Sequence, residues 1–252
     1  MEELVRHRRD WDDLAAFDPL WAVLTQRAKK GGGWDVDEFL ATGEREISAV
    51  LEVAARHDRP RERGRALDFG CGVGRLSRAL GDRFTEVVGV DISEVMLERA
   101  RQLNADRPNI RFVLNVADDL AELESGSFDF IYTSYVLQHM PERADALRFV
   151  AEFVRLLRPG GVAIIQMPER IPWRARPMVR RRLYRMLRSV GLDPAFLIGP
   201  GRTNPMRMHA VAEADMRSWV ASHGGRVADV LPDEETPPPI HAVRYVIVPE
   251  GD

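Results

Sequence analysis

Two aspartates of this sequence, Asp68 and Asp91, follow apolar segments at positions where an α/β protein can bind a polar ligand. Asp68 lies in the stretch RALDFGCGVGR, whose glycines let the backbone turn sharply and approach a ligand closely. Asp91 ends the next apolar segment, EVVGVD, where an ionised carboxylate can accept hydrogen bonds from both hydroxyls of a ribose. Their types and spacing predict a nucleoside site that is held by a carboxylate at each end.

The spacing of the glycines separates two kinds of nucleotide site. The dinucleotide fingerprint G-x-G-x-x-G, counted from Gly70 and Gly72, requires a glycine at position 75, which is Arg75. This argues against an NAD-dependent oxidoreductase. The pattern D-x-G-x-G-x-G resembles instead the first motif of class I S-adenosylmethionine (SAM) methyltransferases. SAM has no phosphate, but its ammonium group can be held by Asp68, directly or through water. A strand–glycine–helix turn without any ligand is the structural alternative.

Later segments resemble the same family in the correct order. FDFIY and VLQHMP resemble its fourth-strand segment, which passes under the transferable methyl group, and LLRPGG resembles the turn before its fifth strand. The resemblance covers residues 65–167 and, more loosely, the last hairpin. It implies a Rossmann-like α/β fold, with a seven-stranded, mostly parallel sheet and helices on both faces. It also implies SAM as the cofactor and S-adenosylhomocysteine (SAH) as the product.

The cofactor site implied by the resemblance follows the ends of the first four strands. Ile92 and Met96 are expected to pack on the adenine, whereas Asp91 has helix capping as its structural alternative. The family often has an aspartate near the position of Val116, which is absent here, so Asn115, Asp118 or the Ala117 amide is left to contact the adenine edge. The predicted cofactor-binding residues are Asp68, Gly70, Cys71, Gly72, Gly74, Asp91, Ile92, Met96, Ala117, Asp118 and Ser134.

Two histidines are the candidate catalytic residues. Methyl transfer is an in-line displacement that mainly requires the acceptor to be positioned, but a hydroxyl acceptor also needs a base. His139 follows the predicted fourth strand, and imidazole is largely neutral near pH 7. Its structural alternative is packing at the start of the next helix. His209 is a second candidate, as a base or a substrate-binding group. We therefore expect O-methylation of a sugar or another secondary metabolite. N-methylation of an amine and a non-catalytic SAM-binding protein are the alternatives.

The elements around this core are expected to shape the acceptor pocket. Helical patterns in residues 1–60 predict an N-terminal cap, and residues 61–252 are expected to form the SAM-binding methyltransferase domain. Within that domain, the proline-rich insertion 168–208 is predicted to be a substrate lid before the last two strands. Ordinary packing is the alternative for the aromatic residues of the cap. Substrate contacts are predicted for Trp11, Trp21, Phe39, Tyr135, Gln138 and Arg207.

The arginine-rich centre of the insertion allows three interpretations. It is a solvated face, a lid that binds an anionic acceptor, or a surface that lies on a membrane near a lipid-like acceptor. RNA is less favoured, because the basic run has few interleaved aromatic residues. The net charge of −3 does not indicate a nucleic-acid partner either.

Composition sets the remaining limits. Cys71 is the sole cysteine, which excludes an intrachain disulfide, and no Cys/His spacing typical of zinc sites is present, so no metal is expected. The amino terminus is charged, and no apolar run approaches membrane-spanning length, so we expect a cytoplasmic protein. The oligomeric state is not indicated by the sequence.

Overall fold

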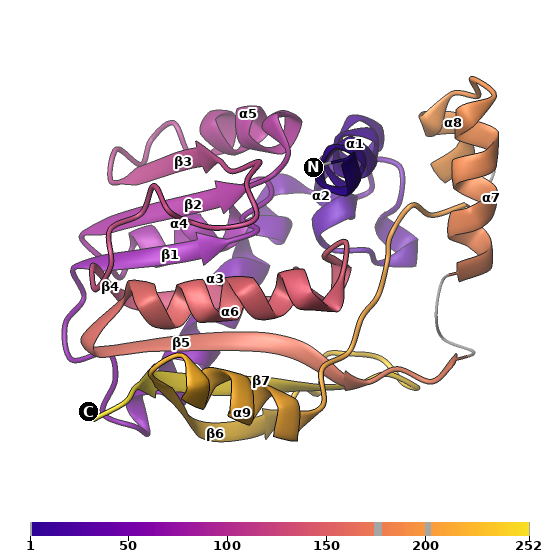
Figure 1. Ribbon diagram of the computed structural model, residues 1–252. Coiled ribbons are helices and arrows are strands. Elements are labelled where there is room, and N and C mark those ends of the chain that lie inside the picture. The colour runs from indigo at the N-terminus through magenta and orange to yellow at the C-terminus, as the bar shows by residue number, and fades with distance from the viewer. Residues whose placement is uncertain (1, 174–177, 200–202, 252) are drawn as a thin grey trace.

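The computed structural model describes residues 2–173, 178–199 and 203–251. Its strands form a seven-stranded sheet in the order β3-β2-β1-β4-β5-β7-β6 (Figure 1). Only β7 runs antiparallel to its neighbours, β5 and β6, and the other pairs are parallel. This confirms the predicted Rossmann-like sheet. The strands are β1 (Arg65–Phe69), β2 (Glu86–Asp91), β3 (Ile110–Leu114), β4 (Phe128–Thr133), β5 (Leu157–Arg170), β6 (Gly225–Pro232) and β7 (His241–Pro249).

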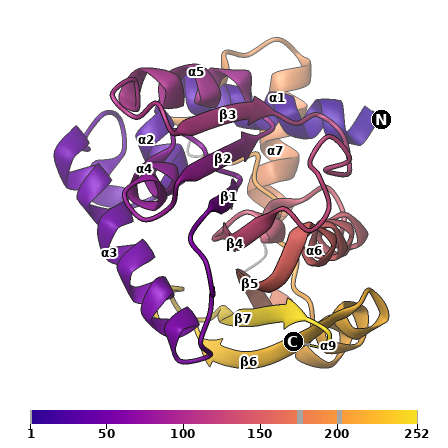
Figure 2. The same cartoon turned by 90° about the vertical axis from the view of Figure 1, so that its left-hand side faces the viewer.

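Helices cover both faces of the sheet (Figure 2). Successive strand residues point to opposite faces, so Ala66 and Phe130 join the apolar core under α3 and α4, whereas Leu67 and Ile131 join the core under α6 and α9. The remaining helix, α5, contacts β2 and β3. These helices are α3 (Val36–Ala55), α4 (Arg75–Gly81), α5 (Glu94–Leu103), α6 (Arg143–Leu156) and α9 (Glu213–Ser222).

A separate group of helices lies beyond the carboxyl ends of β1, β2 and β3 (Figure 1). Leu14 and Trp21 near the amino terminus share a third apolar cluster with Tyr184 and Leu197, which come much later in the chain. The group is therefore built from two segments that are far apart in the chain. Its members are α1 (Glu2–Phe17), α2 (Pro19–Val23), η1 (Arg27–Lys29), α7 (Met178–Ser189) and α8 (Pro194–Ile198).

The boundaries of the predicted cap and insertion differ from the structure. Helix α3 lies within residues 1–60, but Ile47, Val50 and Ala54 bury it against the sheet, so it belongs to the central layers. Strand β5 begins at Leu157 and includes the predicted RPGG turn, with a register shift against β4. It also continues to Arg170, three residues into the predicted insertion. In the part of the chain that the structure describes, no helix is long and apolar enough to cross a membrane.

Candidate active site

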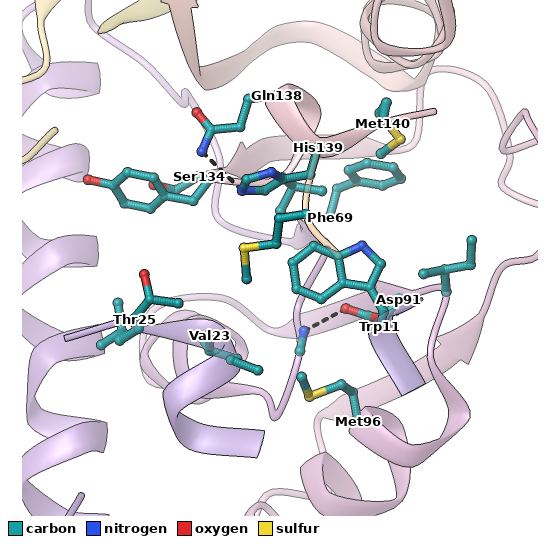
Figure 3. A pocket seen from close by; sticks show the side chains of 18 of the residues that line it. Trp11, Val23, Thr25, Phe69, Asp91, Met96, Ser134, Gln138, His139 and Met140 are labelled. Atoms are coloured by element: carbon teal, nitrogen blue, oxygen red, sulfur yellow. Dashed lines mark hydrogen bonds between the residues drawn. The ribbon is translucent and has the colours of Figure 1, made fainter. Parts of the chain in front are cut away.

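A cavity of about 960 Å³ opens at the carboxyl ends of β1, β2 and β4 (Figure 3). Gly70 follows β1, Asp91 ends β2 and Ser134 follows β4, and all three line the cavity. Met206 and Met208, from the returning part of the insertion, line it from the other side. The site thus lies at the edge of the sheet where open α/β folds bind ligands.

The glycine loop forms one wall of the cavity and requires glycine at two positions. Gly70 and Gly72 both have positive φ angles, of 75° and 52°, which side chains disfavour. A Cβ on Gly70 would lie 2.3 Å from Cγ2 of Val136, and a Cβ on Gly72 would lie 2.7 Å from Cγ2 of Val23. Both glycines line the cavity, where the loop backbone can approach a ligand closely.

Asp91 is held in a fixed orientation on the cavity wall. The Gly72 N–H donates to its Oδ2 at 2.8 Å (Figure 3). The Ser93 N–H donates to its Oδ1 at 2.9 Å. Each carboxylate oxygen keeps a further lone pair, so both can still accept a hydrogen bond from a ligand hydroxyl. Burial raises the pKa of this carboxyl, because the charged form loses solvation. Ile92 and Met96, which were predicted to pack on the adenine, also line the cavity.

Asp68 differs from the prediction, because it does not line the cavity. The side chain is buried, and the Ser77 hydroxyl donates to its Oδ2 at 2.6 Å. Among the described residues, Oδ1 has no hydrogen-bond partner. Burial raises the pKa of this carboxyl to about 7. A contact between Asp68 and a ligand in the cavity would therefore need a bridging water or a movement of the loop.

Three further predicted cofactor residues also lie outside the cavity, whereas Ala117 and Ser134 line it. Cys71 is buried, with its thiol close to the Gly72 carbonyl. Gly74 precedes α4 with a φ of 79°, and a Cβ there would lie 2.6 Å from Asn104 Nδ2, so its role is in packing. Asp118 is paired with Arg148 at the surface. Asn115, which the sequence offered as an alternative adenine contact, does line the cavity.

His139 lies on the cavity wall with both ring nitrogens engaged. Its Nδ1 is 2.5 Å from the Arg207 carbonyl oxygen, which can only accept, so Nδ1 carries the proton and Nε2 is the basic atom. The Gln138 amide donates to Nε2 at 3.1 Å, and the Trp11 ring packs edge-on with a centroid separation of 5.7 Å (Figure 3). Burial lowers the pKa of His139 to about 4, so the imidazole is neutral at pH 7.

His209 and Arg207 do not line this cavity. The backbone N–H of His209 donates to the Gln138 carbonyl at 2.7 Å. The Arg207 guanidinium donates to the Pro141 carbonyl at 2.6 Å and pairs with Glu3. Their backbone groups therefore hold Gln138 and His139 in place, and the predicted catalytic and substrate-binding roles of their side chains are not supported.

The predicted substrate-binding residues divide into two groups. Trp11, Tyr135 and Gln138 line the cavity. Trp21 and Phe39 lie in the apolar cluster of the cap instead, and the Trp21 indole N–H donates to the Gln26 carbonyl at 3.1 Å. Apolar packing is the stronger requirement for these two rings, so they support the cavity wall without forming it.

A polar network that the sequence analysis missed forms another part of the wall. Arg75 donates to Glu46 at 2.7 Å and to the Thr42 hydroxyl at 3.2 Å, and the Tyr132 hydroxyl donates to Glu46 at 2.9 Å. Thr42, Glu46 and Arg75 line the cavity. One signal was available: Glu46 stands seven residues after Phe39, on the buried face of an otherwise apolar helix.

Tyr135 has a backbone conformation that is unusual for its residue type. Its φ of 60° lies in the left-handed region, and its N–H donates to the side-chain oxygen of Gln166 at 3.1 Å. Such strain persists where the surrounding structure enforces it, which is common at functional sites. No group of His, Cys, Asp or Glu side chains among the described residues is arranged to hold a metal ion.

Part of this chain is similar in sequence to known methyltransferases. Residues 67–165 match the family model of a methyltransferase domain. A trans-aconitate 2-methyltransferase of Methylobacterium radiotolerans is 34% identical over 184 residues, which are 65% of this chain and 63% of that protein. A tocopherol O-methyltransferase of Arabidopsis thaliana is 36% identical over 126 residues, which are 48% of this chain and 35% of that protein. The chain thus spans less than two thirds of the length of these curated relatives.

Solved structures share the fold at lower identity. Magnesium protoporphyrin IX methyltransferase from Synechocystis, with bound SAH, superposes with a TM-score of 0.62 at 20% identity and covers 98% of this chain and 100% of that chain. A SAM-dependent methyltransferase from Leishmania major has a TM-score of 0.62 at 16% identity, covering 98% of this chain and 83% of that chain. These similarities establish the fold.

Proposed function

We propose that this chain, whose residues 67–165 match the family model of a methyltransferase domain, transfers the methyl group of SAM to a small molecule. The observation that carries the proposal is the continuity of the cavity. One wall holds Asp91, Ile92 and Met96, and another holds Tyr135 and His139. Ligand pockets measure about 300–1,000 Å³, and the cavity of 960 Å³ lies near the upper end of this range, which suits the proposed pairing of a cofactor with a small acceptor.

The residues on the first wall fit the cofactor of this family. Asp91 presents oriented carboxylate oxygens to ribose hydroxyls, Ile92 and Met96 offer an apolar surface to the adenine, and Gly72 allows close approach of the backbone. Among the described residues, Asp68 Oδ1 has no hydrogen-bond partner, so it can accept from a water that bridges to the ammonium group. When bound, SAM supplies a methyl group that is already activated by the sulfonium.

A hydroxyl group is the acceptor that His139 supports. The Arg207 carbonyl fixes the tautomer in which Nε2 is basic, and a hydroxyl that displaces the Gln138 amide from Nε2 can transfer its proton there. Because the pKa is about 4, the proton moves to His139 only as attack makes the hydroxyl acidic. Trp11, whose ring packs against His139, and Tyr135 line the same cavity.

A carboxylate is the second candidate acceptor, and one observation favours it. The exposed Arg45 lines the cavity and, among the described residues, pairs with no acidic side chain. An arginine fork of this kind matches an anionic group. A relative is named for trans-aconitate, which is an anion. An ionised carboxylate needs no base, so this candidate predicts that His139 is dispensable.

The first experiment tests binding and turnover separately. Calorimetry is carried out with SAH and with NAD, and the protein is then incubated with methyl-labelled SAM and small-molecule extracts, followed by identification of the labelled product. SAH binding and a labelled hydroxyl product support the proposal. Preferential binding of NAD contradicts the cofactor assignment. SAH binding without a labelled product from any hydroxyl, carboxyl or amine acceptor would support a non-catalytic SAM-binding protein.

His139→Gln then tests the base with the identified acceptor. For a hydroxyl acceptor we expect kcat to fall by about 10²- to 10⁴-fold, with SAH affinity kept within about twofold. His209→Gln is the matched control, because its side chain lies outside the cavity. An unchanged kcat in His139→Gln would exclude the base role and favour the carboxylate acceptor.

A further inference from the structure

Helix α7 carries an apolar stripe that faces away from the protein. Val179, Leu183, Met186 and Val190 follow one another at intervals of four, three and four residues, which places them on one side of the helix and the turn that follows. Their exposed fractions are 80%, 41%, 58% and 69%. On neighbouring α8, Phe196 is also more than half exposed. A soluble helix normally turns such a stripe toward the core.

The opposite face of α7 is attached to α1, which fixes the orientation of the stripe. The Tyr184 hydroxyl donates to Asp13 at 2.6 Å, and Arg188 forms an ion pair with the same carboxylate at 3.1 Å. Tyr184 is buried, and Leu187 packs against the apolar cluster of the cap. Turning the apolar stripe inward would break these contacts, so the exposed stripe is part of the folded arrangement.

The charge beside the stripe is strongly positive. Helix α7, MVRRRLYRMLRS, has five arginines and no acidic residue, although the whole chain has a net charge of −3. Arg180, Arg182 and Arg185 are exposed, and within the described ranges none of them pairs with a carboxylate. These arginines flank the apolar stripe. A partner that matches this face must offer an apolar surface to the stripe and negative charge to the arginines beside it.

We propose that α7 binds the surface of an anionic lipid bilayer, with its apolar stripe at the level of the acyl chains and its arginines at the headgroups. Amphipathic helices with apolar residues on one side and Lys or Arg on the polar side bind membrane interfaces in this way. Each arginine near an anionic surface adds electrostatic attraction that salt screens. Figure 1 shows α7 beyond the carboxyl ends of the strands. The cavity is lined by residues that follow those same ends, so the docked protein would face the bilayer with this end.

This inference does not depend on the proposed methyl transfer, and flotation of vesicles tests it without cofactor. The full chain is mixed with vesicles of phosphatidylcholine alone or with about one third phosphatidylglycerol, at low and high salt. We expect flotation with the anionic vesicles at low salt, and a loss of about tenfold or more in partitioning at high salt or with neutral vesicles.

Two variants of exposed residues on α7, each with a matched control elsewhere, test whether binding depends on this helix. Leu183→Ser/Met186→Ser removes half of the stripe, and Arg180→Gln/Arg182→Gln/Arg185→Gln removes three charges. Each should reduce partitioning by about tenfold or more. Val95→Ser, at an exposed apolar site on α5, and Arg56→Gln/Arg111→Gln/Arg226→Gln, at exposed sites elsewhere, should bind like the wild type.

Three outcomes would overturn the proposal. These are a wild-type chain that does not float with anionic vesicles, α7 variants that float as well as the wild type, and control variants that lose binding equally. A dimer in sedimentation velocity that Leu183→Ser/Met186→Ser abolishes would assign the stripe to a second copy of the chain instead. A circular dichroism spectrum and melting temperature like those of the wild type show that each variant keeps the fold.

Discussion

Asp68 and Asp91 carry the same functional group near the ends of adjacent strands, but their surroundings differ. The Asp91 carboxylate accepts two backbone N–H groups on the cavity wall, whereas Asp68 lies behind that wall with Ser77 as its donor. Backbone amides orient a carboxylate without neutralising it, so Asp91 remains available to a ligand. At the residue scale, the two acids should therefore respond differently to loss of charge.

Asp91→Asn should weaken SAH binding by about 10- to 100-fold. It removes a charged acceptor, worth about 1.5–3 kcal/mol, and turns an amide N–H₂ toward a backbone N–H. Asp118→Asn is the control, because the structure places Asp118 in a surface pair with Arg148. Calorimetry with SAH measures both, and equal losses in the two variants would contradict the assignment of Asp91.

Asp68→Asn should change how stability depends on pH. The folded carboxyl has a pKa of about 7, above its unfolded value near 4, so the folded state keeps a proton that the unfolded state releases between these values. The free energy of unfolding therefore falls as pH rises from about 4 to 7. The asparagine side chain does not titrate, so the variant's free energy of unfolding does not fall for this reason. Its stability relative to the wild type should therefore rise by on the order of 3 kcal/mol from pH 4 to pH 8.

Urea unfolding at pH 4, 6 and 8 measures this difference. Asp37→Asn provides the comparison, because Asp37 is exposed near the start of α3. A difference between Asp68→Asn and wild type that stays constant with pH would show that Asp68 does not hold a proton in the folded protein.

At the scale of elements, one carboxylate joins α1 to α7. Asp13 accepts from both Tyr184 and Arg188, which come from a segment more than 170 residues later in the chain. The sequence shows each helix but not this connection, because the acid and its partners are not close in the chain. The position of α7 therefore depends on a contact that can be removed without touching the cavity.

Asp13→Ala should release α7 locally. Loss of charged hydrogen bonds costs about 1–2 kcal/mol, which corresponds to about 5- to 30-fold faster hydrogen exchange in α7. Exchange followed by mass spectrometry measures this, with Asp37→Ala as the control. SAH affinity should stay close to that of the wild type. Faster exchange throughout the sheet would show instead that Asp13 supports global stability.

At the scale of the whole molecule, the cavity is assembled from distant parts of the chain. Its lining includes Trp11 from α1, Val23 from α2, Gly72 from the glycine loop, Met206 from the insertion and Thr236 from the β6–β7 connection. A ligand that fills the cavity contacts all these segments at once. Binding should therefore stabilise the cap and both returning segments together with the loop.

Saturating SAH should slow hydrogen exchange in residues 2–26 and 203–208 as well as in residues 70–74. At a concentration of about 100 Kd, binding to the folded state adds about 2.7 kcal/mol to stability, which also raises the melting temperature. Exchange of the intact protein with and without SAH measures the effect, and α9 serves as the internal control because its residues do not line the cavity. Protection confined to residues 70–74 would contradict a cavity shared with the cap.

The sequence alone determined the strand segments, the position of the glycine loop and the place of Asp91 at the end of a strand, whereas the seven-stranded sheet was implied by the family resemblance. These follow from local causes: apolar strand segments, glycines that permit positive φ angles, and an acid at the end of a strand. The histidine of VLQHMP, which lies in the short helix η2 (Leu137–His139) after β4, also lines the cavity.

Only the tertiary structure decided which polar and aromatic side chains reach the cavity. Asp68 and His209 were expected there and lie elsewhere, whereas Glu46 and Arg75 line it without having been predicted. The cause is packing between distant segments: the Arg207 carbonyl sets the tautomer of His139 across 68 residues of chain. The direction of a side chain depends on neighbours that the local sequence does not contain, so its role follows from the folded arrangement.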